Sequence, residues 1–234
     1  MISHVSDKGG SDFLFDLEQA PDLLMFERLA FRQGYRSVAG VDEAGRGSLA
    51  GPVVAAAVIL ARDVPMPGVN DSKKLTPAQR EALYSRIMKN AQSVGIGYGD
   101  HALVDDINIL QATLQAMKQA VGMLSIKPDF ILIDGTFKIS VPLPQKTIKK
   151  GDSASLSIAA ASIIAKVTRD RLMIECDDRY PGYGFAAHKG YGCAAHLAAI
   201  AELGPCAIHR KTFRGVKEYV ASAKKMSLFI GNGL

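Results

Sequence analysis

Two apolar runs that flank a glycine-rich turn place the strongest constraint on the fold of this chain. The first run, 37–41, ends at the acidic pair Asp42-Glu43, and the second extends from 52 to 61. Side chains on a regular strand alternate between two faces, so adjacent acids converge on one site only where a strand ends, bends or bulges. The glycines of the segment 45–47 make such a bend accessible. We therefore predict a strand that ends in two carboxylates beside an open turn.

Two further acids also stand at element ends. Asp134 follows the apolar run 130–133, and Asp152 precedes a long helical pattern. Together with Asp42 and Glu43 they supply the oxygen-only, anionic coordination that Mg²⁺ or Mn²⁺ prefers. The pattern favours a metal-dependent site for phosphates. For an isolated Asp-Glu pair, the alternative interpretation is a solvated hairpin turn.

Hydrophobic periodicity predicts the helices. Residues 76–79 place Thr at a cap, Pro at the first helical position and Gln in a capping box, so a helix begins there. Apolar residues at three- and four-residue intervals from 107 to 124 predict a second helix, capped by Asp105 or Asp106. The small residues of a third helix, 155–176, allow it to approach the sheet closely. A short docking helix is predicted around 23–29.

The strands predict one mixed sheet. They are expected at 37–43, 53–60, 91–98, 130–134 and 146–149. The first three are linked as an antiparallel meander, and a helix between the third and fourth favours a parallel crossover. A chain of 234 residues with 48% hydrophobic content is long enough for one sizeable core. Composition and periodicity alone predict an α/β protein with one domain.

Charge and cysteine usage narrow the class of protein. The net charge of +5 suits a polyanionic partner, and Lys and Arg residues cluster in or beside the segments named above. The three cysteines are far apart and lack paired spacing, which argues against structural zinc or a disulfide framework. The longest apolar run, 52–61, is too short to span a bilayer, and no targeting pattern opens the chain. We expect no membrane contact and a cytoplasmic protein.

Six motifs along the chain resemble, in order and spacing, those of bacterial ribonuclease HII. The resemblance covers about Ser37 to Phe213, and one departure is Ser48, where most family members carry proline. The motifs are VAGVDEAGRGSLAGPV (38–53), NDSKKL (70–75), IDG (133–135), KGDS (150–153), AASIIAKVTRD (160–170) and YGFAAHKGY (183–191).

The resemblance implies a ribonuclease H-like fold, in which helices flank a mixed five-stranded sheet. It implies an N-terminal extension at 1–36, a catalytic domain at 37–215 with a helical C-terminal segment from about 181, and a tail at 216–234. The implied activity is hydrolysis of the RNA strand of RNA–DNA hybrids and incision 5′ of single ribonucleotides embedded in duplex DNA. Mg²⁺ or Mn²⁺ would be the cofactor, and the products would carry 3′-hydroxyl and 5′-phosphate ends.

The resemblance also assigns roles to individual residues. Gly45-Arg46-Gly47 would read the ribose 2′-hydroxyl, and Tyr183 would stack on the deoxyribose that follows the ribonucleotide. The metal ligands and catalytic residues would be Asp42, Glu43, Asp134 and Asp152. The substrate-binding residues would be Gly45, Arg46, Gly47, Lys73, Lys74, Lys166, Arg169 and Tyr183.

Each of these assignments has a structural alternative. Tyr183 can be a packing aromatic, Lys73-Lys74 a solvated charge run, and Arg169 a salt-bridge partner of Asp170. His188 can be a solvated loop histidine.

The tail and the overall function also have alternatives. Residues 225–229 loosely resemble the peptide by which bacterial repair enzymes bind the replication sliding clamp, but they can instead anchor the tail on its own domain. Two other functions compete with the leading one. They are a metal-dependent nuclease of similar fold that acts on DNA alone and a non-catalytic nucleic-acid-binding module.

Overall fold

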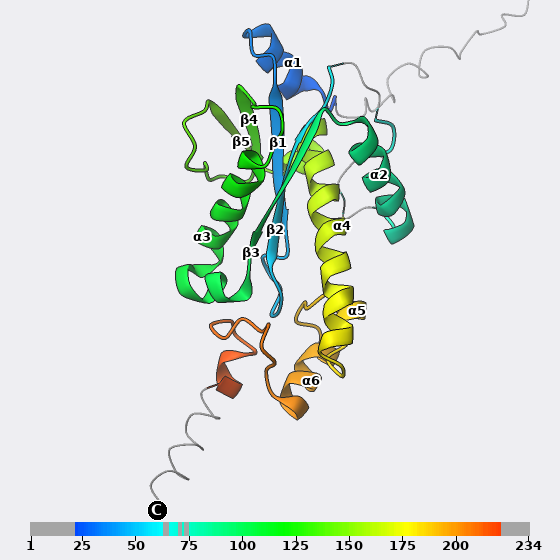
Figure 1. Ribbon diagram of the computed structural model, residues 1–234, viewed down its shortest axis with the longest axis vertical. Coiled ribbons are helices and arrows are strands. Elements are labelled where there is room, and N and C mark those ends of the chain that lie inside the picture. The colour runs from blue at the N-terminus through cyan, green and yellow to red at the C-terminus, as the bar shows by residue number, and fades with distance from the viewer. Residues whose placement is uncertain (1–21, 63–65, 70–71, 73–74, 221–234) are drawn as a thin grey trace, which may run out of the picture.

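A five-stranded mixed sheet forms the centre of the protein. The computed structural model describes residues 22–62, 66–69, 72 and 75–220 (Figure 1). Lys73, Lys74 and the segment 225–229 therefore lie outside the described residues. The strands are β1 (Val38–Ala44), β2 (Val53–Ile59), β3 (Ser93–Gly99), β4 (Phe130–Asp134) and β5 (Gln145–Ile148).

The strand order is β3-β2-β1-β4-β5. β1 and β3 pair with β2 in antiparallel fashion, while β4 pairs in parallel with both β1 and β5. The predicted meander, parallel crossover and mixed sheet are confirmed. Because Val41 of β1 is in register with Ile133 of β4, Asp42 and Asp134 follow at the same end of two adjacent parallel strands.

Helices cover both faces of this sheet. The helices before and along the sheet are α1 (Met25–Arg32), α2 (Pro77–Asn90), α3 (His101–Gly122) and α4 (Leu156–Arg179), and the segment after α4 adds α5 (Phe185–His188) and α6 (Ala194–Leu203). In Figure 1, α3 lies on one side of the sheet and α4 on the other, with α2 outside α4. Of the helices that the structure describes, none is long and apolar enough to cross a membrane.

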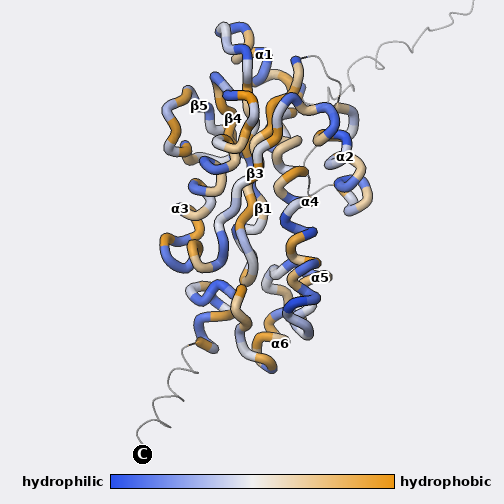
Figure 2. Tube along the Cα trace, in the orientation of Figure 1, coloured by the Kyte–Doolittle hydropathy of each residue, from blue (hydrophilic) through white to orange (hydrophobic). Residues whose placement is uncertain are grey.

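The two cores follow from strand alternation. Val53, Ala55 and Ala57 of β2 join the cluster on the α3 side, whereas Ala56 and Val58 join the cluster on the α4 side. β2 is therefore buried along its whole length, as a central strand between two helical layers must be. Figure 2 shows the hydrophobic colour concentrated on the strands and on the helix faces turned toward them.

The helix termini confirm one prediction and correct another. Thr76 and Gln79 form the predicted capping box at the start of α2. α3 begins earlier than predicted, because Asp100 caps it by accepting a hydrogen bond from Leu103 N at 2.7 Å. Asn108, with φ of 68°, interrupts the helix. Asp105 is therefore not a cap, and its carboxylate accepts hydrogen bonds from the backbone of the segment 211–212.

α4 lies against β1 with backbone in contact with backbone. A Cβ atom on Gly40 would lie 2.1 Å from the carbonyl carbon of Ser157, so no larger residue fits. The start of α4 is also fixed by Glu27 of α1. Its Oε1 accepts hydrogen bonds from Ser155 Oγ at 2.6 Å and from Ser157 N at 2.9 Å and Oγ at 2.7 Å.

A C-terminal segment follows α4 and packs beneath the sheet in the orientation of Figure 1. Its core contains Met173, Phe185, Ile200 and Val216, and it also includes Leu49-Ala50 from the loop between β1 and β2. Val216, the first residue of the predicted tail, is fully buried. The loop after β1 is thus held between the sheet and this segment.

We predict that Glu27→Ala destabilises the protein by about 2–3 kcal/mol, because three buried donors at the start of α4 lose an anionic acceptor. Urea unfolding monitored by circular dichroism measures the change. Glu27→Gln, which keeps an oxygen at this position, should cost less.

Glu81→Ala is the matched control, since it removes an exposed carboxylate that pairs with Arg171. Its expected cost is below about 1 kcal/mol. Equal losses for Glu27→Ala and Glu81→Ala would contradict the role of Glu27.

Candidate active site

A pocket of about 210 Å³ opens at the end of the sheet where β1 and β4 terminate. Three carboxylates line it, those of Asp42, Glu43 and Asp134. The other lining residues are Ala44, Gly45, Arg46, Ser72, Ser162, Lys166 and Tyr191. Residues from the two parallel strands, the turn after β1 and helix α4 therefore converge on one cavity.

The carboxylates of this pocket repel one another. Asp42 is 4% exposed, and its Oδ1 accepts a hydrogen bond from Glu43 N at 2.7 Å. Burial, followed by the charges of Glu43 and Asp134, raises the pKa of Asp42 well above its usual range. A carboxylate that burial and two like charges disfavour gains from a cation placed beside it.

Asp152 lies behind Asp134, in the 3-10 turn Gly151–Ser153. Asp134 Oδ1 accepts a hydrogen bond from Gly151 N at 2.7 Å, which fixes this turn against the end of β4. Asp152 is buried and does not line the pocket. Three of the four predicted acids thus share one cavity. The fourth, Asp152, follows Gly151, whose N–H donates to Asp134.

The acids have the right ligand atoms for a divalent cation, but their side chains are not arranged as a complete binding site. Carboxylate oxygens are the ligands that Mg²⁺ and Mn²⁺ prefer. Among the described residues, however, no three His, Cys, Asp or Glu side chains are grouped closely enough to form a complete metal-binding cluster. A site with few protein ligands is typical of Mg²⁺, which keeps several waters.

The predicted Gly45-Arg46-Gly47 turn forms one edge of the pocket. Gly45 has φ of +92°, a conformation that favours glycine, and a Cβ at this position would collide with Arg169 Nε at 1.9 Å. Nothing lies within 4 Å of the position where Gly47 would carry a Cβ. The half-exposed Arg46 side chain pairs with Glu43 across 3.3 Å. Backbone on the open side of the turn is therefore accessible to a ligand.

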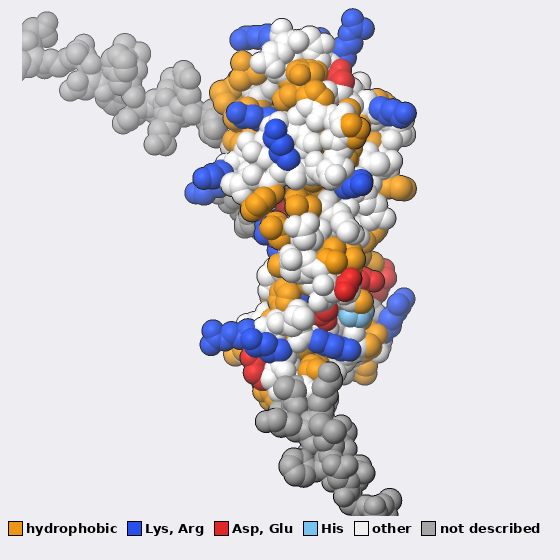
Figure 3. Space-filling view, turned by 90° about the vertical axis from the view of Figure 1, so that its left-hand side faces the viewer, with side chains coloured by type: hydrophobic (Ala, Val, Ile, Leu, Met, Phe, Trp, Pro, Cys, Tyr) orange, Lys and Arg blue, Asp and Glu red, His pale blue; other side chains and the backbone are white. Residues whose placement is uncertain are grey.

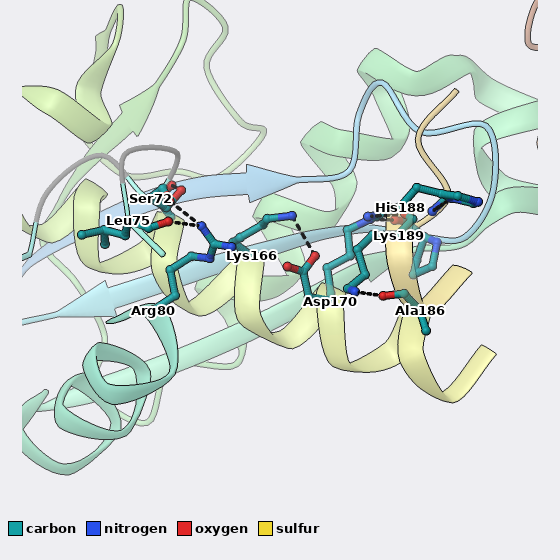
Figure 4. A network of polar contacts seen from close by, with 12 residues as sticks. Ser72, Leu75, Arg80, Lys166, Asp170, Ala186, His188 and Lys189 are labelled. Atoms are coloured by element: carbon teal, nitrogen blue, oxygen red, sulfur yellow. Dashed lines mark hydrogen bonds and ion pairs between the residues drawn. The ribbon is translucent and has the colours of Figure 1, made fainter. Parts of the chain in front are cut away.

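A lysine and an aromatic ring line the pocket beside the turn, where Tyr191 forms a backbone bridge with Ser48. Lys166 Nζ pairs with Asp170 Oδ1 at 2.8 Å, as Figure 4 shows, and lies 5.5 Å from the centre of the Tyr191 ring. Tyr191 is 37% exposed. A second pocket of about 340 Å³ shares Lys166 and Tyr191 with the first and extends to Arg80 and Lys189. The cationic and aromatic side chains form a continuous wall along α4.

Tyr183 does not reach this site. It is 8% exposed, its ring stacks on Phe185 with 5.4 Å between centroids, and its hydroxyl donates to Gly204 O at 2.6 Å. In the structure Tyr183 is therefore a packing aromatic, the alternative considered in the sequence analysis. Both Tyr183 and Tyr191 lie between two glycines, so local sequence does not separate them. Sequence reasoning missed Tyr191, although it lies two residues after Lys189.

Arg169 is also unavailable to a phosphate. It is fully buried, and its guanidinium donates to the carbonyl oxygens of Ala50, Pro52 and Lys189. His188 is likewise engaged, because Nε2 bonds to Tyr183 O at 2.8 Å and Nδ1 accepts from Gly190 N at 3.2 Å. Both side chains shape the loops around the pocket from within.

Comparisons with known proteins agree with this fold. The family model described as Ribonuclease HII matches residues 39–216. The Ribonuclease HII of Geotalea uraniireducens (strain Rf4) is 70% identical over 209 residues, which cover 89% of this chain and 97% of that protein.

Two solved structures are also similar. The ribonuclease H2 of Pyrococcus horikoshii OT3 has a TM-score of 0.68 at 27% identity, over 81% of this chain and 100% of that one. The RNase HII of Archaeoglobus fulgidus, solved in a complex with PCNA, has a TM-score of 0.64 at 25% identity, over 76% and 96%. The chain therefore belongs to the ribonuclease HII family, whose members are endoribonucleases that hydrolyse RNA in RNA–DNA hybrids.

Proposed function

We propose that this endonuclease also incises 5′ of single ribonucleotides embedded in duplex DNA, leaving 3′-hydroxyl and 5′-phosphate ends. The observation that carries the proposal is one pocket that brings three carboxylates, an open glycine turn and an exposed aromatic ring together. A site for phosphodiester hydrolysis needs the carboxylates. A site that selects a ribonucleotide next to DNA needs the turn and the ring.

Asp42, Glu43 and Asp134 would hold Mg²⁺ or Mn²⁺, with Asp152 as a further ligand or as support for Asp134. A divalent cation bound there supplies charge neutralisation at the phosphate and lowers the pKa of water. Before it binds, the three acids share a pocket that burial and mutual repulsion make unfavourable for negative charge. The carboxylates thus prepare an anionic site that only a cation or a proton relieves.

The turn would provide selectivity for ribose. A ribose differs from deoxyribose by one hydroxyl group, which both donates and accepts a hydrogen bond. The open side of Gly47 lets a sugar approach the backbone, and Arg46 can hold the adjacent phosphate. Backbone groups recognise the hydroxyl without regard to base, as an enzyme that acts at any sequence requires.

We assign to Tyr191 the stacking role expected of Tyr183. An exposed ring in the same pocket, on a residue that is bridged to Ser48 beside the turn, can pack against the flat face of the next deoxyribose. A 2′-hydroxyl on that sugar would need space that the ring occupies. The pair of turn and ring would therefore favour a junction from ribonucleotide to DNA.

The side chains along α4 would contact the nucleic-acid backbone where it extends beyond the pocket. Lys166, Lys189 and Arg80 line the two connected pockets (Figure 4). On the face covered by α3, by contrast, Lys and Arg side chains are scattered and Asp and Glu side chains gather below the middle (Figure 3). Glu81 and Asp170 also line the second pocket, and Asp170 pairs with Lys166. The basic side chains there suit phosphate contacts, and binding should weaken steeply with salt.

Contact with a sliding clamp is a further proposal for the segment 225–229. Support comes from the Archaeoglobus fulgidus RNase HII, which was solved with PCNA. We predict that deletion of residues 225–234 abolishes capture of the enzyme by an immobilised clamp, while cleavage of a short duplex is unchanged. Undiminished capture would refute the contact.

We predict that a DNA duplex with one ribonucleotide is cut once, on its 5′ side, when Mg²⁺ or Mn²⁺ is present. Excess EDTA should stop cleavage, and an otherwise identical all-DNA duplex should stay intact. Mass spectrometry of the products identifies the ends. Cutting of the all-DNA duplex would favour the rival nuclease that acts on DNA alone, and binding without cleavage would favour the non-catalytic module.

Asp42→Asn separates catalysis from folding in the same assay. It should abolish cleavage, since it removes an anionic ligand. It should also raise the melting temperature of the metal-free protein at pH 7.5. Because the pKa of Asp42 is raised in the folded state, its contribution to stability is present at low pH and is lost as pH rises through that pKa. The gain from Asp42→Asn should shrink toward pH 4, and a lower melting temperature at pH 7.5 would contradict the electrostatic description.

We predict that Tyr191→Ala lowers kcat/KM on the single-ribonucleotide duplex on the order of tenfold to a hundredfold, as expected for loss of one stacked ring. Tyr183→Phe, the matched control, removes a buried hydroxyl and should cost about 1 kcal/mol of stability with kcat/KM within about twofold. Steady-state kinetics at a temperature where both variants are folded measures the difference. The reverse order of effects would restore Tyr183 to the site.

A further inference from the structure

Arg210 is a fully buried cation in the C-terminal segment, far in sequence from the pocket. It donates from Nη2 to Gly45 O at 2.8 Å and from Nη1 to Arg46 O at 2.9 Å. Nε and Nη2 also bond to Gly51 O, at 3.1 and 2.9 Å. The guanidinium thus binds both ends of the loop that follows β1. Two of its three acceptors belong to the turn that lines the acidic pocket.

The backbone of Leu49 and Gly51 is anchored to the same C-terminal segment, and Gly51 N donates to Ile208 O at 2.9 Å. Leu49 N donates to Gly190 O at 2.8 Å, and Arg210 N donates to Leu49 O at 2.8 Å. Within the described residues neither Arg210 nor Arg169 forms a salt bridge, and the hydrogen bonds of both buried guanidinium groups go to backbone carbonyls. Each group also lies over one aromatic ring, Tyr191 for Arg169 and Phe213 for Arg210. Burying a charge in this way is costly, and a simple packing role would be served as well by an apolar side chain.

The geometry of the peptide unit determines where the N–H groups of the turn point. The C=O and N–H of one peptide unit point in opposite directions because the unit is planar and trans. With the carbonyls of Gly45 and Arg46 directed at Arg210, the N–H groups of Arg46 and Gly47 are directed away from it. Neither N–H donates a hydrogen bond to any of the described residues. Two adjacent backbone donors are therefore held outward at the edge of the pocket.

We propose that Arg210 is a positioning residue that fixes the orientation of these two peptide units so that the turn can read a ribose 2′-hydroxyl. The inference rests on the ribose-reading function proposed above. Burial, followed by repulsion from Arg169, lowers the pKa of Arg210 to about 9, so the guanidinium stays protonated at neutral pH. The forked shape of the group is essential, since one guanidinium reaches three carbonyls at once.

Arg210→Lys tests the proposal, because an ammonium keeps the charge but replaces the planar fork, whose donors are spread over three nitrogens, with one nitrogen on a flexible stem. Two duplexes that differ by one 2′-hydroxyl are titrated with the full-length protein in EDTA, and the ratio of their dissociation constants is measured. We expect the unsubstituted protein to prefer the ribonucleotide duplex. Arg210→Lys should reduce this preference at least fivefold, with its affinity for the all-DNA duplex within about twofold of the original.

Val216→Ala is the matched control, because Val216 is fully buried in the same segment and touches no carbonyl of the turn. It should lower the melting temperature at least as much as Arg210→Lys and keep the preference for the ribonucleotide. An unchanged preference in Arg210→Lys, or an equal loss in both variants, would overturn the positioning role. So would the absence of any preference in the unsubstituted protein.

The binding assay also separates this inference from the proposed activity. A protein that prefers the ribonucleotide duplex in EDTA, loses that preference through Arg210→Lys and yet cuts neither duplex with metal present would refute the incision activity. The positioning role would stand. Normal cleavage together with an insensitive Arg210→Lys would do the opposite.

Discussion

The contact between α4 and β1 is the constraint on which the rest of the structure depends. Gly40 lets the start of α4 approach the backbone of β1, and Gly45 lets Arg169 of the same helix approach the turn. The helix is thereby laid along the strand from end to end. Ser162 and Lys166, which lie between these two points on α4, face Asp42 across the same pocket. The position of the side chains that line the pocket thus depends on two glycines, which have no side chain.

The pocket is built at the expense of stability. Asp42 is buried beside two other acids, and the two buried arginines donate their hydrogen bonds to neutral carbonyl oxygens. Each group is unfavourable where it lies, yet hydrophobic packing on both faces of the sheet and in the C-terminal segment is large enough to hold them. Such unfavourable charge is typical of a site shaped for a charged ligand. The same acids that resist burial are the groups proposed to hold a divalent cation.

Periodicity and motifs predicted the sheet, its mixed order and the three long helices, because each depends on residues near one another in sequence. They also selected Asp42, Glu43 and Asp134, which the structure brings to one pocket. They failed where distant segments decide the outcome. Asp105 resembled a helix cap, but it binds the backbone at 211–212. Tyr183 and Tyr191 share a glycine context, and only packing shows which ring is exposed. Arg169 is a charged residue of the kind expected at the surface, but in the structure it is fully buried.

The C-terminal segment has a consequence for how this enzyme can be divided. Arg210 lies between the loop after β1 and the backbone that Asp105 of α3 anchors, so the segment is fastened at two places in the body of the protein. A fragment that stopped after α4 would keep every predicted acid. It would also leave Met173 bare and the carbonyls of Gly45 and Arg46 facing water. The smallest unit that folds by itself is therefore expected to include this segment together with the sheet and its helices.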